Sequence, residues 1–130
     1  MKYKKIIFRN LNFIPASHEK KDDPGVVKKI LMKSEDFPMN IKIQMINWAR
    51  LFMGRSFISH YHEDMDELFI ITCGKVKIII NGHDDILESG DAIYIPQGSI
   101  HKMDNVSNSD VDYIAIGLSR NKGGKTVITE

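Results

Sequence analysis

The chain has 130 residues, of which 42% are hydrophobic and 27% charged, and its 18 basic and 17 acidic residues leave a formal net charge of +1. This length suits one domain with a core of its own, since domains typically hold about 100–200 residues. The near-neutral charge gives no electrostatic reason to expect nucleic acid or an anionic membrane as a partner. The one cysteine, Cys73, excludes an intrachain disulfide and favours an intracellular setting.

The N-terminal residues lack the pattern of a secretion signal. Their apolar run, 6–8, ends at Arg9 and Asn10, whereas the apolar part of a signal peptide needs about 7–15 residues. No stretch approaches the roughly 20 apolar residues of a membrane span. We therefore expect a soluble, cytoplasmic protein with no membrane partner.

Short apolar runs separated by turn signals favour strands over helices along the whole chain. We expect strands at 3–8, 26–32 and 41–52, with a polar Pro-Gly turn segment at 17–25. Alternating apolar residues at the start of the third run favour a strand there, although a helix over 37–52 remains open.

The second half of the chain has more closely spaced runs. Strands are expected within 57–62, 67–74, 75–80, 86–96 and 111–118. The Asn81-Gly82 pair is the strongest two-residue signal for a β-hairpin. The last segment, 119–130, resembles a loose tail, although 126–129 could pair with a sheet edge. Roughly eight to ten short strands in total predict an all-β sandwich or barrel.

The segment after Gly54 carries a candidate metal site. His60 and His62 are two positions apart, so in a strand both imidazoles lie on the same face. Glu67 begins the next apolar run, and we interpret 63–66 as a charged, solvated turn that brings it back towards the pair. Imidazoles and a carboxylate are ligands for Zn, Fe, Mn, Ni or Cu, and a metal would offset the cost of burying an ionised glutamate.

A third imidazole, His101, follows a Pro-Gly turn at 96–98. We expect this turn to reverse the chain, so that His101 begins a strand beside the one that precedes it. The two remaining histidines, His18 and His83, lie in polar, turn-like segments and are not expected to bind the metal.

These residues resemble the two motifs of the cupin superfamily. The first motif, G-x5-H-x-H-x3,4-E-x6-G, and the second, G-x5-P-x-G-x2-H-x3-N, both match without a gap, and 15 residues separate them. The matching positions are Gly54, His60, His62, Glu67 and Gly74, then Gly90, Pro96, Gly98, His101 and Asn105. Ten such positions in the right order make the resemblance specific, although it covers only 54–105.

The resemblance implies a cupin-type double-stranded β-helix, which is a jelly-roll β-barrel. It implies one divalent transition metal ion held by His60, His62, Glu67 and His101. We expect a single domain over 1–130, with N-terminal strands in 1–50 and a C-terminal strand and tail in 110–130. Gly54 and Gly74 would then frame a hairpin that carries the first three ligands.

Other residues are weaker candidates for the pocket. Trp48, Arg50, Tyr94 and Met103 could line the cavity, and Arg50 could clamp a substrate carboxylate. A surface or interface role is the plainer interpretation of Arg50, and core packing that of Tyr94 and Met103. Cys73 ends an apolar strand, so we interpret it as a buried filler rather than a nucleophile.

The leading function is a metal-dependent enzyme, oxygenase-like, that acts on a small polar molecule; catalytic residues beyond the ligands are unknown. A metal-dependent isomerase or decarboxylase, and a non-catalytic small-molecule binding or sensor protein, are the alternatives. No helix-turn-helix pattern or basic face suggests nucleic acid as a partner. Cupins of this kind are commonly dimers, so we expect a homodimer.

Overall fold

The computed structural model describes residues 5–37 and 42–130, and the side chains of all of these except 120–124. The described chain is almost entirely β-structure, with two 3-10 turns, η1 (Phe8–Asn10) and η2 (Ser34–Asp36). The strands are β1 (Ile14–Pro15), β2 (Val26–Lys33), β3 (Ile43–Leu51), β4 (His60–Ile71), β5 (Lys75–Ile80), β6 (His83–Glu88), β7 (Ala92–Ile95), β8 (His101–Asn105) and β9 (Val111–Ile128).

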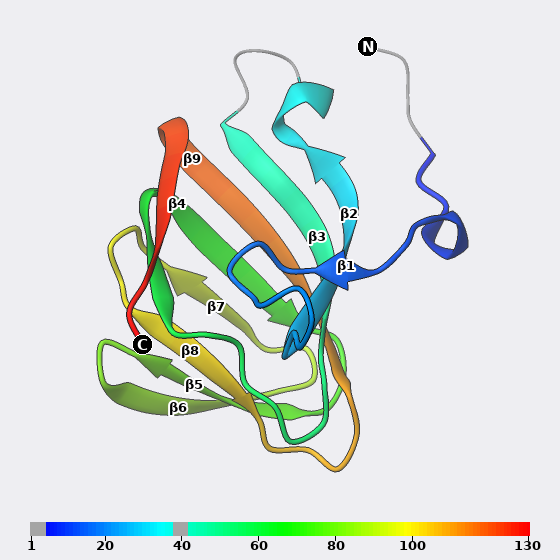
Figure 1. The fold of residues 1–130 in the computed structure, drawn as a ribbon, viewed down its shortest axis with the longest axis vertical. Helices are drawn as coiled ribbons and strands as arrows, with labels where there is room; N and C mark the ends of the chain where they lie inside the picture. Colours follow the sequence, from blue (N-terminus) through cyan, green and yellow to red (C-terminus); the bar gives the residue numbers. More distant parts are fainter. Residues whose placement is uncertain (1–4, 38–41) are drawn as a thin grey trace.

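The strands form two antiparallel layers that together make a barrel (Figure 1). One layer runs in the order β1, β2, β3, β9, β4 and β7. In the other, the beginning of β4 is followed by β8, β5 and β6. Strands β4 and β9 belong to both layers, and this sharing joins the layers into the cupin-type double-stranded β-helix that the sequence predicts.

Strand β4 bends from one layer into the other, and the bend decides where its side chains point. Its pairing with β9 shifts register between His62 and Asp64 and again between Asp64 and Asp66. Before these bulges His60 and His62 are buried, and after them burial alternates from Glu67 onwards. Five positions separate His62 from Glu67, so a regular strand would place them on opposite faces. The bulges change that alternation and let all three side chains point inward.

The prediction of a turn at 63–66 is therefore wrong. These residues belong to one continuous strand, and Gly54 and Gly74 do not frame a hairpin. The prediction failed because a segment with three acidic residues among four positions resembles a turn. A bulged strand at the corner between two sheets can carry the same residues, because its outer side chains stay close to water.

The last strand corrects a second expectation. Residues 119–130 are no loose tail, since β9 continues to Ile128. The end of β9 pairs with the beginning of β4, with Tyr61 opposite Val127 and His62 opposite Thr126. The alternative that 126–129 pairs with a sheet edge is thus the correct one, and it places Thr126 next to a candidate ligand.

The hairpin predicted at Asn81-Gly82 is confirmed. It joins β5 to β6, with Ile80 paired to His83 across the turn. Both turn residues have positive φ, 48° for Asn81 and 84° for Gly82, as a two-residue hairpin turn of this type requires. His83, which follows the turn, is exposed.

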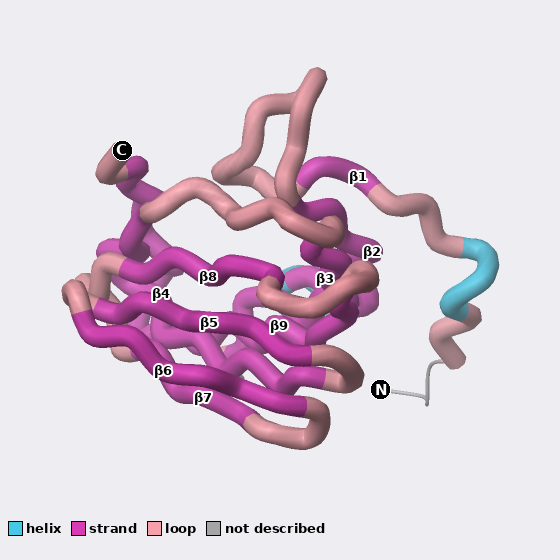
Figure 2. The backbone as a smooth tube through the Cα atoms, turned by 90° about the horizontal axis from the view of Figure 1, so that it is seen from below, coloured by secondary structure: helices cyan, strands magenta, loops and turns pink. Residues whose placement is uncertain are grey.

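The N-terminal expectation is only partly met. Residues 3 and 4 lie outside the described part, and the remainder of the strand predicted at 3–8 is irregular chain that enters η1. This segment runs along the outside of the barrel (Figure 2), where the Phe8 ring meets Trp48 edge to face at 5.3 Å. The strand predicted at 26–32 is confirmed as β2, and β3 is a strand rather than a helix.

The apolar core lies inside the barrel. Its fully buried side chains come from both layers, and Phe57 and Phe69 meet edge to face at 6.2 Å. Within residues 5–37 and 42–130, no helix is long and apolar enough to cross a membrane.

Candidate metal centre

The structure brings together the four residues that the sequence singles out as metal ligands. His60, His62, Glu67 and His101 are all buried, and one potential ligand atom from each lies within 4.8 Å of the others. The imidazole rings are close, with centroids 4.4 Å apart for His60 and His101 and 5.0 Å apart for His60 and His62. The arrangement is the one that a single metal ion needs.

His101 reaches the cluster by a route different from the expected one. It lies directly opposite His60 in the pairing of β8 with β4. Strand β8 otherwise pairs with β5, whereas its predecessor β7 pairs with β4. The Pro-Gly turn at 96–98 therefore carries the chain from one layer to the other and does not form a hairpin. His60 and His101 are cross-strand neighbours, so their side chains share the inner face.

Each of the three imidazoles is oriented by a partner on its Nδ1 atom. His60 Nδ1 donates to the carbonyl oxygen of Ile58, and His101 Nδ1 donates to that of Ser99 at 2.9 Å. His62 Nδ1 lies 2.9 Å from the hydroxyl of Thr126. With every Nδ1 engaged elsewhere, the three Nε2 atoms are left for the centre of the cluster, as in metal sites where such partners set the tautomer and the ring orientation.

Glu67 lies between two of these nitrogens. Its Oε1 atom is 2.8 Å from His62 Nε2 and 3.2 Å from His101 Nε2. Burial alone would raise the pKa of Glu67, but the adjacent imidazoles of His101 and His62 lower it below its usual range. The carboxylate is thus the charged, acceptor form that can bind a cation.

His60 is held in the neutral form that metal binding requires. Burial lowers its pKa from 6.5 to about 3, and the neighbouring imidazoles of His18 and His101 act in the same direction. A neutral imidazole offers a nitrogen lone pair, whereas imidazolium does not.

One unsatisfied atom tests whether a metal would fit. His62 Nε2 is buried and makes no hydrogen bond of acceptable geometry, although Glu67 Oε1 is close. A buried polar atom without a partner costs free energy. A cation at the centre of the cluster would give it one, so the residues present suit a metal ion, and a buried His-His-Glu-His cluster in this fold suggests one.

Three residues of the cluster, His60, His62 and Glu67, line one end of a cavity of about 100 Å³. Much of the wall is apolar and is contributed by inward-facing residues of β2, β3, β4 and β9. These apolar lining residues are Val26, Met45, Ala49, Met65, Phe69 and Ala115.

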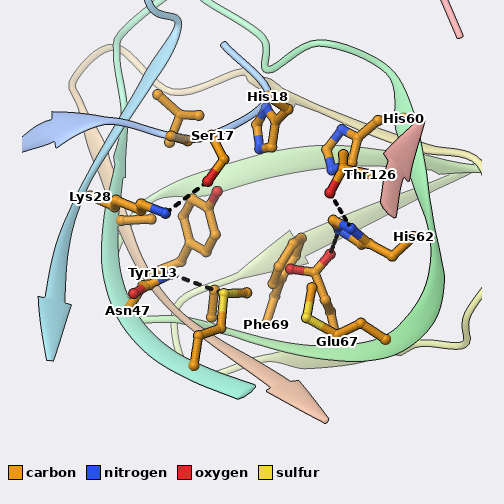
Figure 3. Close-up of a pocket in the computed structure, with 16 residues that line it drawn as sticks. Ser17, His18, Lys28, Asn47, His60, His62, Glu67, Phe69, Tyr113 and Thr126 are labelled. Atoms are coloured by element: carbon orange, nitrogen blue, oxygen red, sulfur yellow. Dashed lines mark hydrogen bonds and ion pairs between the residues drawn. The ribbon is translucent and has the colours of Figure 1, made fainter. Parts of the chain in front are cut away.

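The opposite end of the cavity is polar. Figure 3 shows Ser17, Lys28, Tyr113 and Asn47 on one side and His60, His62 and Glu67 on the other, with Phe69 between them. We call Ser17, Lys28, Asn47 and Tyr113 the distal wall. None of the four was a candidate in the sequence analysis. Extending the apolar alternation along β3 would have placed Asn47 inward, and the same rule applies to Lys28 after Val26 and to Tyr113 after Val111.

His18 is nearer the site than its polar surroundings in the sequence suggested. Its ring stacks on His60 with centroids 4.1 Å apart, and its Nδ1 atom pairs with Glu19 at 2.9 Å. Ser17 and His18 line the inner cavity and also a larger outer hollow of about 520 Å³. The segment that follows β1 therefore separates the cavity from the surface.

The other predicted pocket residues lie elsewhere. Trp48 and Arg50 point to the outer face of β3, where both donate to Asp112, and Arg50 does so from Nε at 2.7 Å. Met103 is fully buried in the core, and Tyr94 is half-exposed. The structure thus does not place Arg50 as a substrate clamp, because its guanidinium is committed on the far side of the sheet.

Two further interpretations need correction. Cys73 is exposed and not a buried filler, because it lies in the turn after β4. Asp66 is buried and not solvated, since it accepts hydrogen bonds from the Tyr94 hydroxyl and, at 2.7 Å, from the Gln97 backbone. Asn105 ties a loop, because its side-chain amide donates to the carbonyl oxygens of Leu51 and Ser109.

Comparison with known proteins agrees with this architecture. The chain matches the family model for the cupin domain over residues 48–117, which is more than half of its length. It therefore belongs to the cupin superfamily.

Among curated proteins, the chain is 32% identical over 81 residues to an oxalate-binding protein of Thermotoga maritima, covering 58% of this chain and 67% of that protein. It is 33% identical over 61 residues to an uncharacterized protein of Aquifex aeolicus, covering 47% of this chain and half of that protein.

Similar solved structures share the fold. A protein of Thermotoga maritima described as a predicted oxalate decarboxylase has a TM-score of 0.77 at 23% identity, with 89% of this chain and 99% of that chain covered. The polyketide cyclase RemF of Streptomyces resistomycificus has a TM-score of 0.79 at 12% identity, with 99% and 87% covered. At such identities the likeness concerns the fold and not the reaction.

Proposed function

We propose that this cupin binds one divalent transition metal ion through His60, His62, Glu67 and His101 and acts as a metal-dependent enzyme on a small polar molecule. The observation that carries the proposal is the buried cluster in which one potential ligand atom from each of these four residues lies within 4.8 Å of the others. The imidazole Nδ1 atoms are engaged by other partners, which orients the rings before any ion arrives.

The donor set limits the choice of ion. Three imidazoles and a carboxylate, with no thiolate, suit Fe, Mn, Zn, Ni or Cu better than Ca or Mg. When bound, such an ion would polarise a substrate oxygen as a Lewis acid, and a redox-active ion would also support oxygenase chemistry.

The cavity bears on the proposed chemistry as well. Among the described residues that line it, Glu67 is the sole carboxylate, and with that carboxylate in the cluster the remaining groups that could transfer a proton include His18, Lys28 and Tyr113. The chain's own contribution is to exclude water with the apolar wall and to hold a small molecule against the cluster. The names of the relatives, an oxalate-binding protein and a predicted oxalate decarboxylase, favour a carboxylate as that molecule.

Oxygenase-like chemistry leads, with decarboxylation and isomerisation as alternatives for the same site. A non-catalytic binding or sensor protein is the candidate from another class. The name of the Thermotoga maritima relative, which describes binding only, favours it.

The test begins with protein stripped of metal and reloaded with Fe(II) or Mn(II). Oxygen uptake and carbon dioxide release are followed across small carboxylic acids, enols and diols. We expect turnover that requires the metal and is lost in Glu67→Gln. Turnover independent of metal would overturn the proposal, and tight binding without turnover would establish the binding protein instead.

A further inference from the structure

The distal wall of the cavity contains a polar side chain whose hydrogen-bonding groups are not satisfied and that takes no part in the metal cluster. Asn47 is 4% exposed, and its buried Oδ1 atom has no hydrogen-bond partner among the described residues. Within the same part of the chain, its Nδ2 atom donates only to the sulfur of Met45, at 3.0 Å, and a thioether is a weak acceptor. An amide held so poorly inside a cavity is suited to a ligand that supplies the missing partner.

Lys28 adds a positive charge to the same wall. It lies on β2, and its ammonium donates to the Ser17 hydroxyl at 3.1 Å. No carboxylate of the described chain pairs with it. Burial lowers the pKa of Lys28, and the charge of Glu67 across the cavity acts in the opposite direction. An ammonium that is partly withdrawn from water and has no counterion attracts an anion.

The charges of the whole cavity indicate how much negative charge it takes. A divalent ion and the Lys28 ammonium, less the one negative charge of Glu67, leave two positive charges inside a largely apolar wall. Buried charge must be balanced, so the complementary ligand carries two negative charges. The Lys28 side chain and the cluster residues His60, His62 and Glu67 lie at opposite ends of the cavity (Figure 3).

We propose that the distal wall is a second anion-recognition site, in which Lys28, with Asn47, binds the far end of a short two-headed anion such as a dicarboxylate whose near end lies at the metal cluster. The proposal rests on the proposed function for the near end only. Lys28 and Asn47 are specificity residues here, and the cavity volume of about 100 Å³ limits the ligand to a few carbons between its carboxylates.

The experiment compares two-headed with one-headed ligands. Mn(II)-loaded protein is titrated by calorimetry with oxalate, malonate, succinate, acetate and inorganic phosphate. The wild type is compared with Lys28→Met, which keeps the length of the side chain, and with Asn47→Ala. Lys33→Met, on the same strand but outside the cavity and exposed, is the matched control. Circular dichroism and Mn(II) stoichiometry establish that each variant is folded and loaded.

We expect a short dicarboxylate to bind better than acetate. Lys28→Met should weaken its binding by about tenfold or more, since a hydrogen bond to a charged group is stronger than a neutral one, while acetate binding changes by less than about twofold. Asn47→Ala should act in the same direction but less strongly, and Lys33→Met should have no effect. Equal weakening of acetate and dicarboxylate by Lys28→Met, or no weakening at all, would overturn the proposal, as would tighter binding of phosphate than of every dicarboxylate.

Failure of the metal site gives a different result. If the wild type takes up none of Mn(II), Fe(II), Zn(II), Ni(II) and Cu(II), the proposed function is wrong, and the same titrations are run on the metal-free protein. Dicarboxylate binding that still depends on Lys28 would then uphold the distal wall. Absence of binding, or binding that is unchanged in Lys28→Met, would contradict the proposal that the distal wall recognises an anion as well.

Discussion

His62 and Thr126 are joined by a 2.9 Å hydrogen bond between Nδ1 and Oγ1, which ties the final strand to a candidate metal ligand. Thr126 lies directly opposite His62 in the pairing of β9 with β4. The end of the chain thus contributes to the cluster although it supplies no ligand atom.

The first prediction concerns this hydrogen bond. Thr126→Val keeps the shape of the side chain and removes the hydroxyl, so the His62 ring loses the partner that orients it. We expect metal affinity to fall by about 10–100-fold, the usual effect of removing such a partner, with the barrel still folded. Competition with a chromophoric chelator measures the affinity.

Thr129→Val is the matched control, because the Thr129 hydroxyl bonds with Ser59 away from the cluster. It should leave metal affinity unchanged. The same affinity in Thr126→Val as in the wild type would show that the hydrogen bond does not orient the ring.

The second prediction concerns the pH dependence of the metal-free protein. The pKa of His60 falls from 6.5 to about 3 on folding. Between these values the unfolded chain binds a proton that the folded protein does not, so stability rises with pH and is lost as the pH drops below about 6.5. From pH 7 to pH 5 we expect a loss of roughly 1–2 kcal/mol in the free energy of unfolding by urea.

In His60→Gln this acid sensitivity should be smaller, because glutamine does not titrate. His83→Gln, which changes an exposed histidine of the hairpin, should retain it. An unchanged slope in His60→Gln would contradict the assignment of the effect to the buried imidazole.

The third prediction separates Arg50 from the site. Its guanidinium donates to both carboxylate oxygens of Asp112, at 2.7 and 3.0 Å. Arg50→Met should lower the free energy of unfolding by roughly 1 kcal/mol, since the pair is partly exposed, and leave the affinity for metal and small anions unchanged. A selective loss of anion affinity in Arg50→Met would instead support Arg50 as a clamp on a substrate carboxylate.

The fourth prediction concerns the corner of β4. Asp66 accepts hydrogen bonds from the Tyr94 hydroxyl and the Gln97 backbone, which ties the β7–β8 turn to the bulged strand. Asp66→Asn should cost roughly 1–2 kcal/mol in stability, and Tyr94→Phe less. Metal stoichiometry should be unchanged in both variants, and metal loss in Asp66→Asn would mean that this carboxylate is part of the centre.

Sequence predicted the ligand cluster better than its surroundings. Alternation places His60 beside His62, and the motif spacing adds Glu67 and His101, because local spacing reflects which face a side chain occupies. The continuous path of β4 could not be predicted, since a bulge and a turn have similar polar sequences. The positions of Thr126 and of the distal wall depend on pairings between segments that are distant in the chain. The spacing of residues along the sequence does not reveal these pairings. The homodimer and the cytoplasmic location stay predictions.

The central claim is that the four clustered residues hold one metal ion, and elemental analysis of protein purified without added metal tests it most directly. We expect about one divalent transition metal ion per chain in the wild type, and also in Cys73→Ala, which removes the exposed thiol. His62→Ala should lose most of the metal while circular dichroism shows an intact β-barrel. A metal-free wild type, or stoichiometric metal retained in His62→Ala, would contradict the account.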